Sequence, residues 1–582
     1  MLEYDYYEEN EDLKRHVEEN IDWEEAVSAY EDDFADAKLF RETGDENLSM
    51  APGDLEEALE YYRAIFQSMG EIAGKFIAPR VERAEREGLR MVDGVVEFPP
   101  DVLESFAALK EAGIPAYGIS RHYGGLGLPF QAQMAYLEML ARAFPALSLT
   151  IGCLNIPEVL ERYASEEICR EWIPPAAAGE MICAMALTEP DYGSDLSNLR
   201  LRAEKDEKGE WKLSGVKRFI THGCGLTGLS SSLLTLARSG TPENGARGLS
   251  FFLVRGEDVK TASIEKKMGL HCSPTCEIVY ENSPGILIGE EGQGLIRGAM
   301  SMMNAARLAI AAQSLGIAQS AFSEAARYAA EREQFGGPIA EIPAVKRMLR
   351  RMDEEMNAMR VLLGEAARTT DLYVWRRDRL RRTGMADREL NKDQTVRRWQ
   401  RLANFFTPLV KYYIAERCNE IAYDAVQVFG GSGYVEDFSI SRIYRDARIT
   451  SIYEGTSQMQ VHGAIGGITA GLNEGGLLKD YIENEMELYG PSPEIRALYE
   501  SFAEFVQLYK TLEEGEAREE LALDATETAA RFLGSLLLER SIGRARGEDL
   551  RKRRETLRTG YATEARAVIA AARSRLDAAL KK

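Results

Sequence analysis

The stretch from Arg445 to Gln460 reads RDARITSIYEGTSQMQ and holds a carboxylate, Glu454, in a short segment between apolar runs. Glu454 follows an alternating apolar run and precedes two hydroxyl residues, Thr456 and Ser457. A carboxylate in this position could start a helix or act as a catalytic base. Long Ala-rich patterns of helical period precede this stretch, and they predict a bundle of helices around it.

The hydrophobic period changes along the chain, and the changes predict an α+β protein of several domains. Apolar residues recur with helical spacing over residues 55–180, and with a period of two, between Gly-rich turns, over residues 181–290. Helical spacing then returns and persists to the end. We therefore predict an N-terminal helical domain (55–180), a middle β-barrel (181–290), a C-terminal four-helix bundle (291–475) and an additional C-terminal helical domain (476–582).

Two segments of the chain are distinguished by their charge. Residues 1–54 form an acidic N-terminal extension, and a charge run of this kind indicates a solvated face or a flexible arm with short helices. The segment YVWRRDRLRRTGMADREL, residues 373–390, breaks the helical pattern and predicts a basic loop insertion.

Composition excludes several classes of function. The net charge of -23 over 582 residues argues against a nucleic-acid partner, because such binding depends on clustered Lys and Arg. No apolar run reaches the ~20 residues that span a bilayer, so we expect no transmembrane segment. The N-terminus is acidic, unlike secretory and mitochondrial presequences. These features predict a cytoplasmic protein.

Cysteine and glycine patterns point to neither a metal site nor a Rossmann domain. The seven cysteines are scattered and fit a reducing compartment. The segment HCSPTC, residues 271–276, lacks the second ligand cluster that a tetrahedral metal site needs, which favours a structural loop and no metal. None of the Gly-rich segments completes a dinucleotide fingerprint within a βαβ unit.

Four further segments accompany the Glu454 stretch. They are MALTEPDYGSDLSNL (185–199), KRFITHG (217–223), EREQFGGPI (331–339) and QVFGGSGY (427–434). Each alone is also explained as a turn or a helix cap. In this order and spacing, however, they resemble the acyl-CoA dehydrogenase family over roughly residues 60–470. The additional N- and C-terminal segments resemble the larger branch of that family, with the very-long-chain and 3-methylmercaptopropionyl-CoA types.

The resemblance implies FAD as the cofactor and assigns residues to it. In the family, the residue matching Thr188 bonds the flavin ring, that at Ser194 lies near the pyrophosphate and the acyl-CoA, and that at Thr221 lies near flavin N5. The segments near Arg332 and Gln427 match those that hold the adenine end of FAD from a neighbouring subunit, so a homodimer or homotetramer is implied. The full implied set is Met185, Leu187, Thr188, Gly193, Ser194, Phe219, Ile220, Thr221, Arg332, Gln334, Phe335, Gln427, Gly430, Gly431, Thr456 and Gln458.

The resemblance also implies the catalytic base and the substrate contacts. Glu454 matches the family base that removes the α-proton of the thioester, while the β-hydrogen leaves as hydride to flavin N5. Some members carry the base on an earlier helix, but the matching residue here is Ala306, which cannot take a proton. Ser194, Arg307 and Gly455 match substrate-binding positions, although an ordinary ion pair is an alternative for Arg307.

Two positions depart from the family pattern, and several functional alternatives stay open. The common Trp before the IT pair is Phe219, and a usual Tyr is Met185. The expected reaction is oxidation of an acyl-CoA to a 2,3-enoyl-CoA in fatty acid β-oxidation, with electrons passed to an electron-transfer flavoprotein. The alternatives are an acyl-CoA oxidase that uses oxygen and a non-catalytic scaffold that binds FAD or acyl-CoA. The pattern does not identify the acyl chain.

Overall fold

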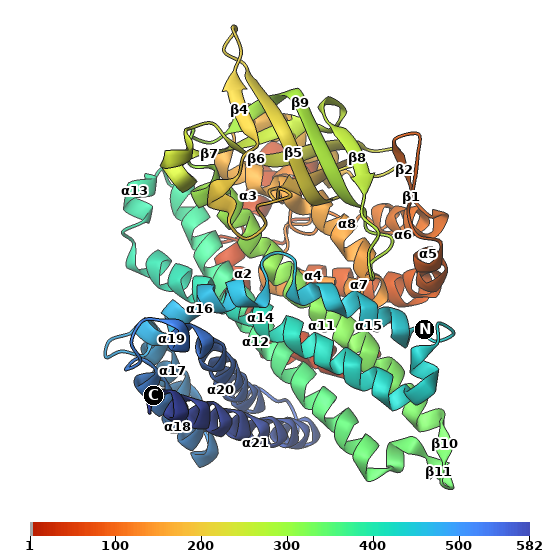
Figure 1. Ribbon diagram of the computed structural model, residues 1–582, viewed down its shortest axis with the longest axis vertical. Helices are drawn as coiled ribbons and strands as arrows, with labels where there is room; N and C mark the ends of the chain where they lie inside the picture. The colour runs from red at the N-terminus through yellow and green to blue at the C-terminus, as the bar shows by residue number, and fades with distance from the viewer. Residues whose placement is uncertain (1–3, 582) are drawn as a thin grey trace. The chain divides into compact units, whose positions relative to one another are not determined.

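A computed structural model describes residues 4–581 of the chain (Figure 1). Contacts divide these residues into two compact units. Unit 1 contains residues up to 9, 34–129 and 139–309, and unit 2 contains residues 10–33, 130–138 and 310 onward. None of the helices formed by the described residues is long and apolar enough to cross a membrane. The predicted domain boundaries stay predictions.

Helices form the first part of unit 1. The Asp54 carboxylate accepts a hydrogen bond from the Glu57 N–H at 3.0 Å and so caps α4 (Leu55–Glu71). Ser165 caps α10 in the same way. The other elements before the main sheet are α3 (Ala35–Thr43), α5 (Val81–Glu87), the hairpin β1 (Arg90–Val92) and β2 (Val95–Glu97), α6 (Pro100–Glu111), α8 (Pro145–Asn155), α9 (Leu160–Tyr163) and α10 (Glu166–Ala177); α7 (Phe130–Ala143) begins in unit 2.

The sheet of unit 1 closes on itself. Its strands are β3 (Met181–Ala186), β4 (Arg202–Lys205), β5 (Trp211–Thr221), β6 (Ser230–Arg238), β7 (Leu249–Arg255), β8 (Lys260–Ile264) and β9 (Thr275–Ile288). Strand pairing runs from β6 through β4, β5, β9 and β7 and returns to β6, while β3 pairs with β6 and β8 with β9. Alternate side chains, including Leu213, Leu233 and Ile278, fill the interior. The predicted β-barrel is therefore confirmed.

Long helices dominate unit 2 (Figure 1). Helices α12 and α14 pack along one another, and α16 lies against α14. Close approach at this last contact depends on glycine, since a Cβ at Gly467 would lie 2.7 Å from the Phe405 ring. The elements are α11 (Met300–Glu331, which starts in unit 1), β10 (Glu333–Gln334), β11 (Gly337–Pro338), α12 (Pro343–Arg382), α13 (Asp387–Leu390), α14 (Gln394–Phe429), α15 (Ile440–Arg448) and α16 (Ser457–Gly471).

The prediction of a basic loop insertion was wrong. Helix α12 continues through Arg382, and only a short turn separates it from α13. Arginine is a good helix former, and the like charges are tolerated because acidic groups of unit 2 neutralise part of them. Arg379 pairs with Asp32 at 2.6 Å and Arg376 with Asp393 at 3.5 Å.

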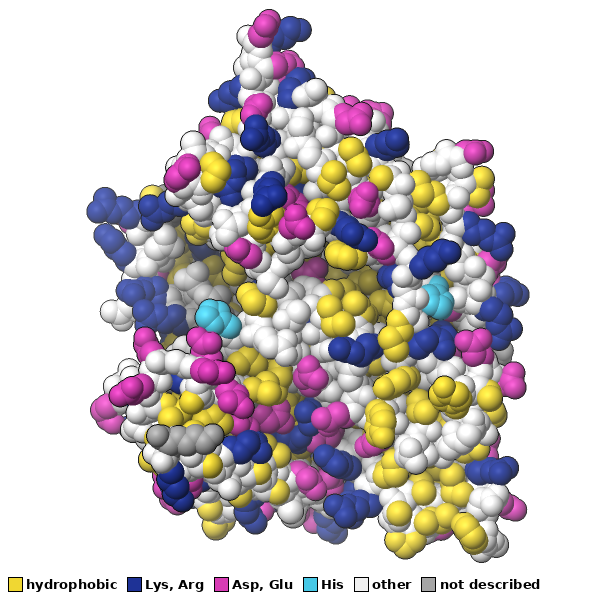
Figure 2. Space-filling model, in the orientation of Figure 1, with side chains coloured by type: hydrophobic (Ala, Val, Ile, Leu, Met, Phe, Trp, Pro, Cys, Tyr) yellow, Lys and Arg dark blue, Asp and Glu magenta, His cyan; other side chains and the backbone are white. Residues whose placement is uncertain are grey.

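The C-terminal extension folds as five more helices of unit 2. They are α17 (Leu477–Tyr489), α18 (Pro493–Tyr509), α19 (Glu516–Glu520), α20 (Ala522–Gly543) and α21 (Glu548–Ala579). Figure 2 shows acidic and basic side chains interspersed over these helices. Their inner faces join α12 and α14 through buried polar contacts. The Tyr413 hydroxyl lies 2.7 Å from both the Glu355 carboxylate and the Tyr561 hydroxyl, and Arg531 bonds the same carboxylate.

The expectation of a solvated or flexible N-terminal arm was also wrong for residues 10–33. This segment contains α1 (Glu11–Arg15) and α2 (Trp23–Tyr30), as the prediction of short helices required, but its acids pair with arginines of unit 2. Arg553 donates to Asp12 at 3.0 Å, and Arg368 donates to Glu25 at 2.9 Å. Burial of Leu13 and other apolar side chains adds to these contacts.

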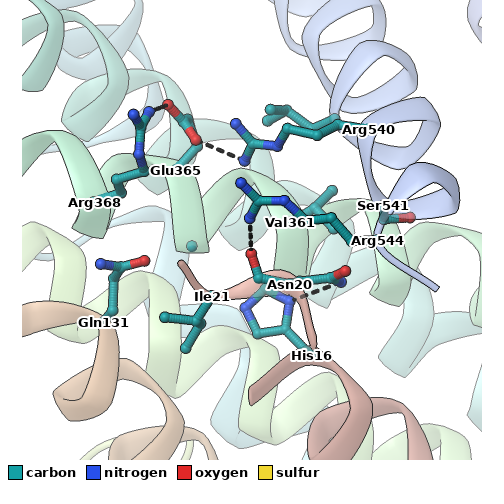
Figure 3. A pocket seen from close by; sticks show the side chains of 12 residues that line it. His16, Asn20, Ile21, Gln131, Val361, Glu365, Arg368, Arg540, Ser541 and Arg544 are labelled. Atoms are coloured by element: carbon teal, nitrogen blue, oxygen red, sulfur yellow. Dashed lines mark hydrogen bonds and ion pairs between the residues drawn. The ribbon is translucent and has the colours of Figure 1, made fainter. Parts of the chain in front are cut away.

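His16 lies at the centre of this docking surface (Figure 3). Figure 3 shows its ring beside Asn20, whose carbonyl bonds Arg544, while Arg540 reaches Glu365. These residues line a cavity of about 20 Å³. That volume is enough for a water molecule. Burial, together with Arg360, Arg554, Arg540 and Arg544, holds the pKa of His16 well below its ordinary value. The ring is therefore neutral at physiological pH and acts as a structural group.

Candidate functional site

The two segments assigned to the flavin ring lie side by side in unit 1. The Thr188 carbonyl accepts a hydrogen bond from the Arg218 N–H at 2.9 Å, which sets the loop after β3 against the end of β5. Thr188 and Thr221 are half-buried, and the residues before them in sequence, Leu187 and Ile220, are buried. The resemblance predicted that Thr188, Phe219 and Thr221 belong to one site, and the fold of unit 1 brings their segments together.

A buried ion pair fixes this loop. The Lys217 ammonium donates to the Leu187 carbonyl at 2.7 Å and to the Glu189 carboxylate at 3.0 Å. The same carboxylate accepts the backbone N–H groups of Arg200 and Leu201 at 2.7 and 2.9 Å. Burial lowers the pKa of Lys217 to about 8, and the charge of Glu189 opposes that shift. Every polar atom named here has a partner, so the loop is held rigidly.

Sequence reasoning missed Lys217 and Glu189 as positioning residues. Both stand in segments that were quoted for other residues. A lysine at a strand position whose neighbours Phe219 and Ile220 are apolar is unusual, because buried lysines need a partner. That signal could have indicated a buried pair, although the sequence does not name the carboxylate.

Phe219 has an unusual backbone and an exposed ring. Its φ is +61°, in the left-handed region that non-glycine residues rarely adopt, and 54% of the residue is exposed to solvent. His222, in the following turn, also has a positive φ of 54° and is buried. Its ring nitrogens lie 2.8 Å from the Thr150 hydroxyl and 3.2 Å from the Gly225 carbonyl. The structure thus holds the end of β5 in a conformation that presents an aromatic face.

The remaining loop residues are accessible. Gly193 and Ser194 are exposed, and Met185 is half-buried within β3. Asp195 next to them accepts hydrogen bonds from Ser197 and Asn198 at 2.7 and 2.6 Å, which closes a short turn. This arrangement leaves the Gly193–Ser194 backbone open to a ligand.

In unit 2, the segment from Arg332 to Phe335 is a hairpin rather than a simple helix end. Strands β10 and β11 pair through Gln334 and Gly337, and the two turn residues, Phe335 and Gly336, have φ of +56° and +91°. Positive φ at both positions is the requirement of a type I′ turn. Phe335 is 97% exposed at its tip, and Arg332 and Gln334 are exposed beside it.

Aromatic contacts join the end of α11, just before this hairpin, to the end of α14. Tyr328, in the last turn of α11, stacks on Phe429 with ring centroids 4.1 Å apart, and its hydroxyl lies 3.3 Å from the Ser432 hydroxyl. Gln427, Gly430 and Gly431 follow on the exposed side. The helix ends that precede Arg332 and hold Gln427 therefore lie together within unit 2, and the roles of these residues stay predictions.

Glu454 is not a helix-starting residue. Helix α16 begins at Ser457 with Thr456 as its N-cap, so Glu454 lies outside the helix in the preceding turn. Its φ is +55°, and the residue is half-buried. A left-handed glutamate costs about 1 kcal/mol or more, and such strain persists only where neighbouring contacts impose it.

Those contacts come from Gln460 and Lys411. The Gln460 side-chain amide donates to the carbonyls of Glu454 and Gly455, both at 3.0 Å. The buried Lys411 ammonium donates to the Gly455 carbonyl at 2.7 Å. Gln458, one turn into α16, is exposed. Sequence analysis did not identify Gln460 or Lys411 as residues that position Glu454. Lys411 lies on α14, about forty residues before the loop it supports.

Two further residues are Tyr453, next to Glu454, and Arg307, on α11. Tyr453 bonds the Gln313 side chain, and its burial, with the charge of Glu454, raises the pKa of Tyr453 well above its ordinary value. Arg307 donates to the Asn304 side chain at 3.0 Å and is half-buried. Its predicted substrate role stays a prediction. No group of described residues has the composition of a metal site.

The residues present fit FAD. The exposed Phe219 ring offers a stacking surface to a flat ring, and the neighbouring hydroxyls offer hydrogen bonds. In unit 2, a Cβ added at Gly430 or Gly431 would meet no atom within 4 Å, so the backbone there is open. Each unit thus offers a surface that a dinucleotide could cover.

Comparison with protein families gives matches along most of the chain. Residues 60–180, 184–283 and 308–458 match the N-terminal, middle and C-terminal domain models of acyl-CoA dehydrogenase. The 3-methylmercaptopropionyl-CoA dehydrogenase of Ruegeria pomeroyi is 32% identical over 456 residues, which cover 72% of this chain and 74% of that protein.

Two further similarities concern an enzyme complex and the fold. The caffeyl-CoA reductase-Etf complex subunit CarC of Acetobacterium woodii is 32% identical over 373 residues, 62% of this chain and 88% of that protein. An acyl-CoA dehydrogenase from Bacillus anthracis, solved in complex with FAD, superposes with a TM-score of 0.73 at 22% identity and covers 89% of this chain and 88% of its own. At this identity the last similarity shows the fold alone.

Proposed function

Because the chain belongs to the acyl-CoA dehydrogenase family and is an FAD-dependent oxidoreductase that acts on acyl-CoA, we propose that Glu454 is its catalytic base. The observation that carries this proposal is the strained, half-buried Glu454 turn, held by Gln460 and Lys411. Strain that the surroundings maintain is typical of functional residues. The product is then a 2,3-enoyl-CoA.

The chain supplies positioning and proton transfer. A thioester α-proton is weakly acidic, so its removal needs a carboxylate held in one geometry. The two carbonyl contacts of Gln460 restrict the backbone of Glu454, and Lys411 restricts Gly455 beside it. When bound, FAD supplies the acceptor for the hydrogen that leaves the β-carbon. In unit 1 the Lys217 and Glu189 pair holds Thr188, which we propose bonds the cofactor together with Phe219 and Thr221.

The electron acceptor, the pathway, the location and the remaining site residues are also proposals. We propose an electron-transfer flavoprotein as acceptor, which the similarity to an Etf-complex subunit supports. A role in fatty acid β-oxidation and a cytoplasmic location follow from the resemblance and the sequence composition alone. The remaining site residues, including Ser194, Arg307 and Gly455 at the substrate, are proposed on the resemblance.

A homodimer is proposed from the exposed aromatic surface of unit 2. Phe335 and Tyr434 are 97% and 90% exposed. Phe335 follows the end of α11 and Tyr434 follows the end of α14, and the Tyr328–Phe429 stack joins those two helix ends. Figure 2 shows hydrophobic side chains gathered in the corner where Figure 1 draws the β10–β11 hairpin. An exposed apolar patch of this kind marks an interaction site.

The base is tested with Glu454→Gln, with Glu474→Gln as the matched control because Glu474 is 93% exposed in the loop after α16. Each protein is mixed anaerobically with a panel of saturated CoA thioesters while flavin absorbance is followed. We expect Glu454→Gln to keep its flavin and to reduce it roughly 10² to 10⁴ times more slowly, and the control to match wild type. Wild-type flavin reduction by Glu454→Gln would refute the assignment. Rapid reoxidation of the reduced wild-type enzyme by aerated buffer would favour an oxidase instead.

The homodimer is tested with Phe335→Ala. We expect this variant to dissociate at concentrations where wild type stays dimeric, as measured by sedimentation velocity, because the exposed ring would be an anchor of the interface. Met50→Ala is the control, since Met50 is also a large exposed apolar residue. Wild type that sediments as a monomer when loaded with FAD would contradict the proposal.

A further inference from the structure

Two cysteines that are far apart in the sequence meet in the barrel of unit 1. Cys276 is the second residue of β9, and its register partner in β5 is Ile220. Cys224 lies in the turn that follows β5, four residues after Ile220. The turn folds back because Gly223 N–H bonds the Ile220 carbonyl and Gly225 N–H bonds the His222 carbonyl, at 3.2 and 2.8 Å. This geometry returns Cys224 to the start of β9.

The two cysteines pack in the same part of the barrel core. Cys276 is fully buried in the core cluster, and Cys224, half-buried, packs against that cluster. The His222 N–H bonds the Pro274 carbonyl at 3.0 Å, so the turn that carries Cys224 is tied to the residues just before Cys276. The Cys224 thiol lies 3.5 Å from the Gly225 carbonyl.

The surroundings favour the thiolate form of Cys276. Hydrogen bonding from Cys224, the backbone N–H groups of Cys224 and Gly223 and the charge of Lys267 lower the pKa of Cys276 against the opposing effect of burial. Bonding to Cys276 and burial raise the pKa of the Cys224 thiol. At Cys183, elsewhere in the barrel, burial outweighs the hydrogen bonds from Ser232 and Leu234 and raises the pKa to about 12. Cys276 therefore differs from Cys183 in the direction of its pKa shift.

We propose that Cys276 and Cys224 form a reversible intrachain disulfide when the protein meets peroxide. In the first step the Cys276 sulfur attacks hydrogen peroxide, the O–O bond breaks, and a sulfenic acid and water form. In the second step the Cys224 sulfur attacks the sulfenic sulfur, the S–O bond breaks, and a disulfide and a second water form. The two thiols lose two electrons and two hydrogens in total, and peroxide accepts both. A dithiol reductant reverses the change by thiol–disulfide exchange.

The disulfide would tie the turn from His222 to Gly225 to the first residues of β9. That turn follows Thr221 directly, so oxidation would stiffen the end of β5. Half-burial of Cys224 gives small oxidants an approach to the pair from that side. The inference rests on the contacts within unit 1 and not on the proposed role of Glu454.

The test uses the full-length holoenzyme and hydrogen peroxide as the probe. The protein is treated with peroxide, unfolded in the presence of an alkylating agent, digested and mapped by mass spectrometry without reduction. We expect a Cys224–Cys276 linked peptide that disappears on treatment with dithiothreitol. Cys183 and Cys418, both buried, serve as internal controls, and we expect them to be oxidised at least roughly tenfold more slowly.

Two variants assign the roles of the sulfur atoms. In Cys224→Ser, Cys276 should be trapped by dimedone as a sulfenic acid, because its resolving partner is gone. In Cys276→Ser, Cys224 should stay reduced. If either variant fails to fold, disulfide mapping of the wild-type protein tests the proposal by itself. Oxidation of all seven cysteines at similar rates, a different disulfide, or a Cys224–Cys276 pair that stays reduced would each overturn the proposal.

Discussion

Two glutamates of unit 2 show opposite ways of holding a carboxylate. Glu355 is buried, accepts the Tyr413 hydroxyl at 2.7 Å and bonds Arg531, which Glu527 also contacts at 3.1 Å. Glu454 is half-buried on a strained turn, and the contacts that hold it grip its backbone and that of Gly455. Side-chain bonds hold Glu355, whereas backbone contacts at Glu454 and Gly455 impose a left-handed turn.

The difference separates stability from activity. A buried carboxylate bonded to a cation and a hydroxyl is costly to disturb, since removal of one partner leaves the other charge buried. A carboxylate whose backbone is fixed and whose side chain is reachable can exchange a proton with a ligand. Charged residues with complete local partners are therefore structural candidates, and strained, accessible ones are functional candidates.

The largest expected effect is on the free energy of unfolding, and substitution of Glu355 tests it. Glu355→Gln should lower the free energy of unfolding by roughly 3 kcal/mol, because the buried Arg531 loses one of its two carboxylate partners and keeps Glu527. Glu454→Gln should leave the free energy of unfolding within about 0.5 kcal/mol of wild type while turnover is lost. Chemical denaturation and steady-state rates of both variants check this. Equal losses of stability in the two would contradict the separation.

A third carboxylate, Asp371, predicts how the free energy of unfolding depends on pH. It is buried but bonded only by neutral donors, namely the N–H groups of Phe130 and Gln131 and the side chains of Gln131 and Trp375. Burial raises the pKa of Asp371 to about 6 against these bonds. The folded state then holds more protons than the unfolded state between about pH 4 and 6, so the free energy of unfolding falls as pH rises through that window.

Asp371→Asn checks this pH dependence. Over that window wild type should lose roughly 3 kcal/mol relative to the variant, which cannot ionise at this position. Denaturation midpoints measured from pH 4 to pH 7 give the difference. Parallel curves for the two proteins would show that Asp371 stays ionised across the window.

The smallest effect concerns the strained turn itself. Gly455 has φ of +91°, and an added Cβ would lie 2.7 Å from the Gln460 amide nitrogen that holds Glu454. Gly455→Ala should therefore lower turnover by roughly tenfold, about 1 to 2 kcal/mol in the barrier. Gly475→Ala is the control, because Gly475 has φ of +66° but open space around it. A control that loses as much turnover would show that strain alone, and not Gln460, is responsible.

Local pattern explains which predictions succeeded. The alternating run from Met181 to Ile288 and the helical periods around it follow from which faces must be buried, so the barrel and the bundle could be predicted. The residues around Thr188, Arg332 and Gln427 were assigned on the family resemblance, and their roles stay predictions. The predicted loop at residues 373–390 failed because charge density was taken as a break, although arginine extends α12 through Arg382.

The sequence by itself determined the order of elements, the family and Glu454 as the candidate base, because these depend on short-range periods and on motifs within a few residues. Only the tertiary structure decided which distant groups meet: Asp12 with Arg553, Lys411 with the Gly455 carbonyl, and Cys224 with Cys276. Such contacts depend on strand register and helix packing over tens to hundreds of residues. Side-chain chemistry alone does not specify them, since any of many arginines could have paired with a given acid.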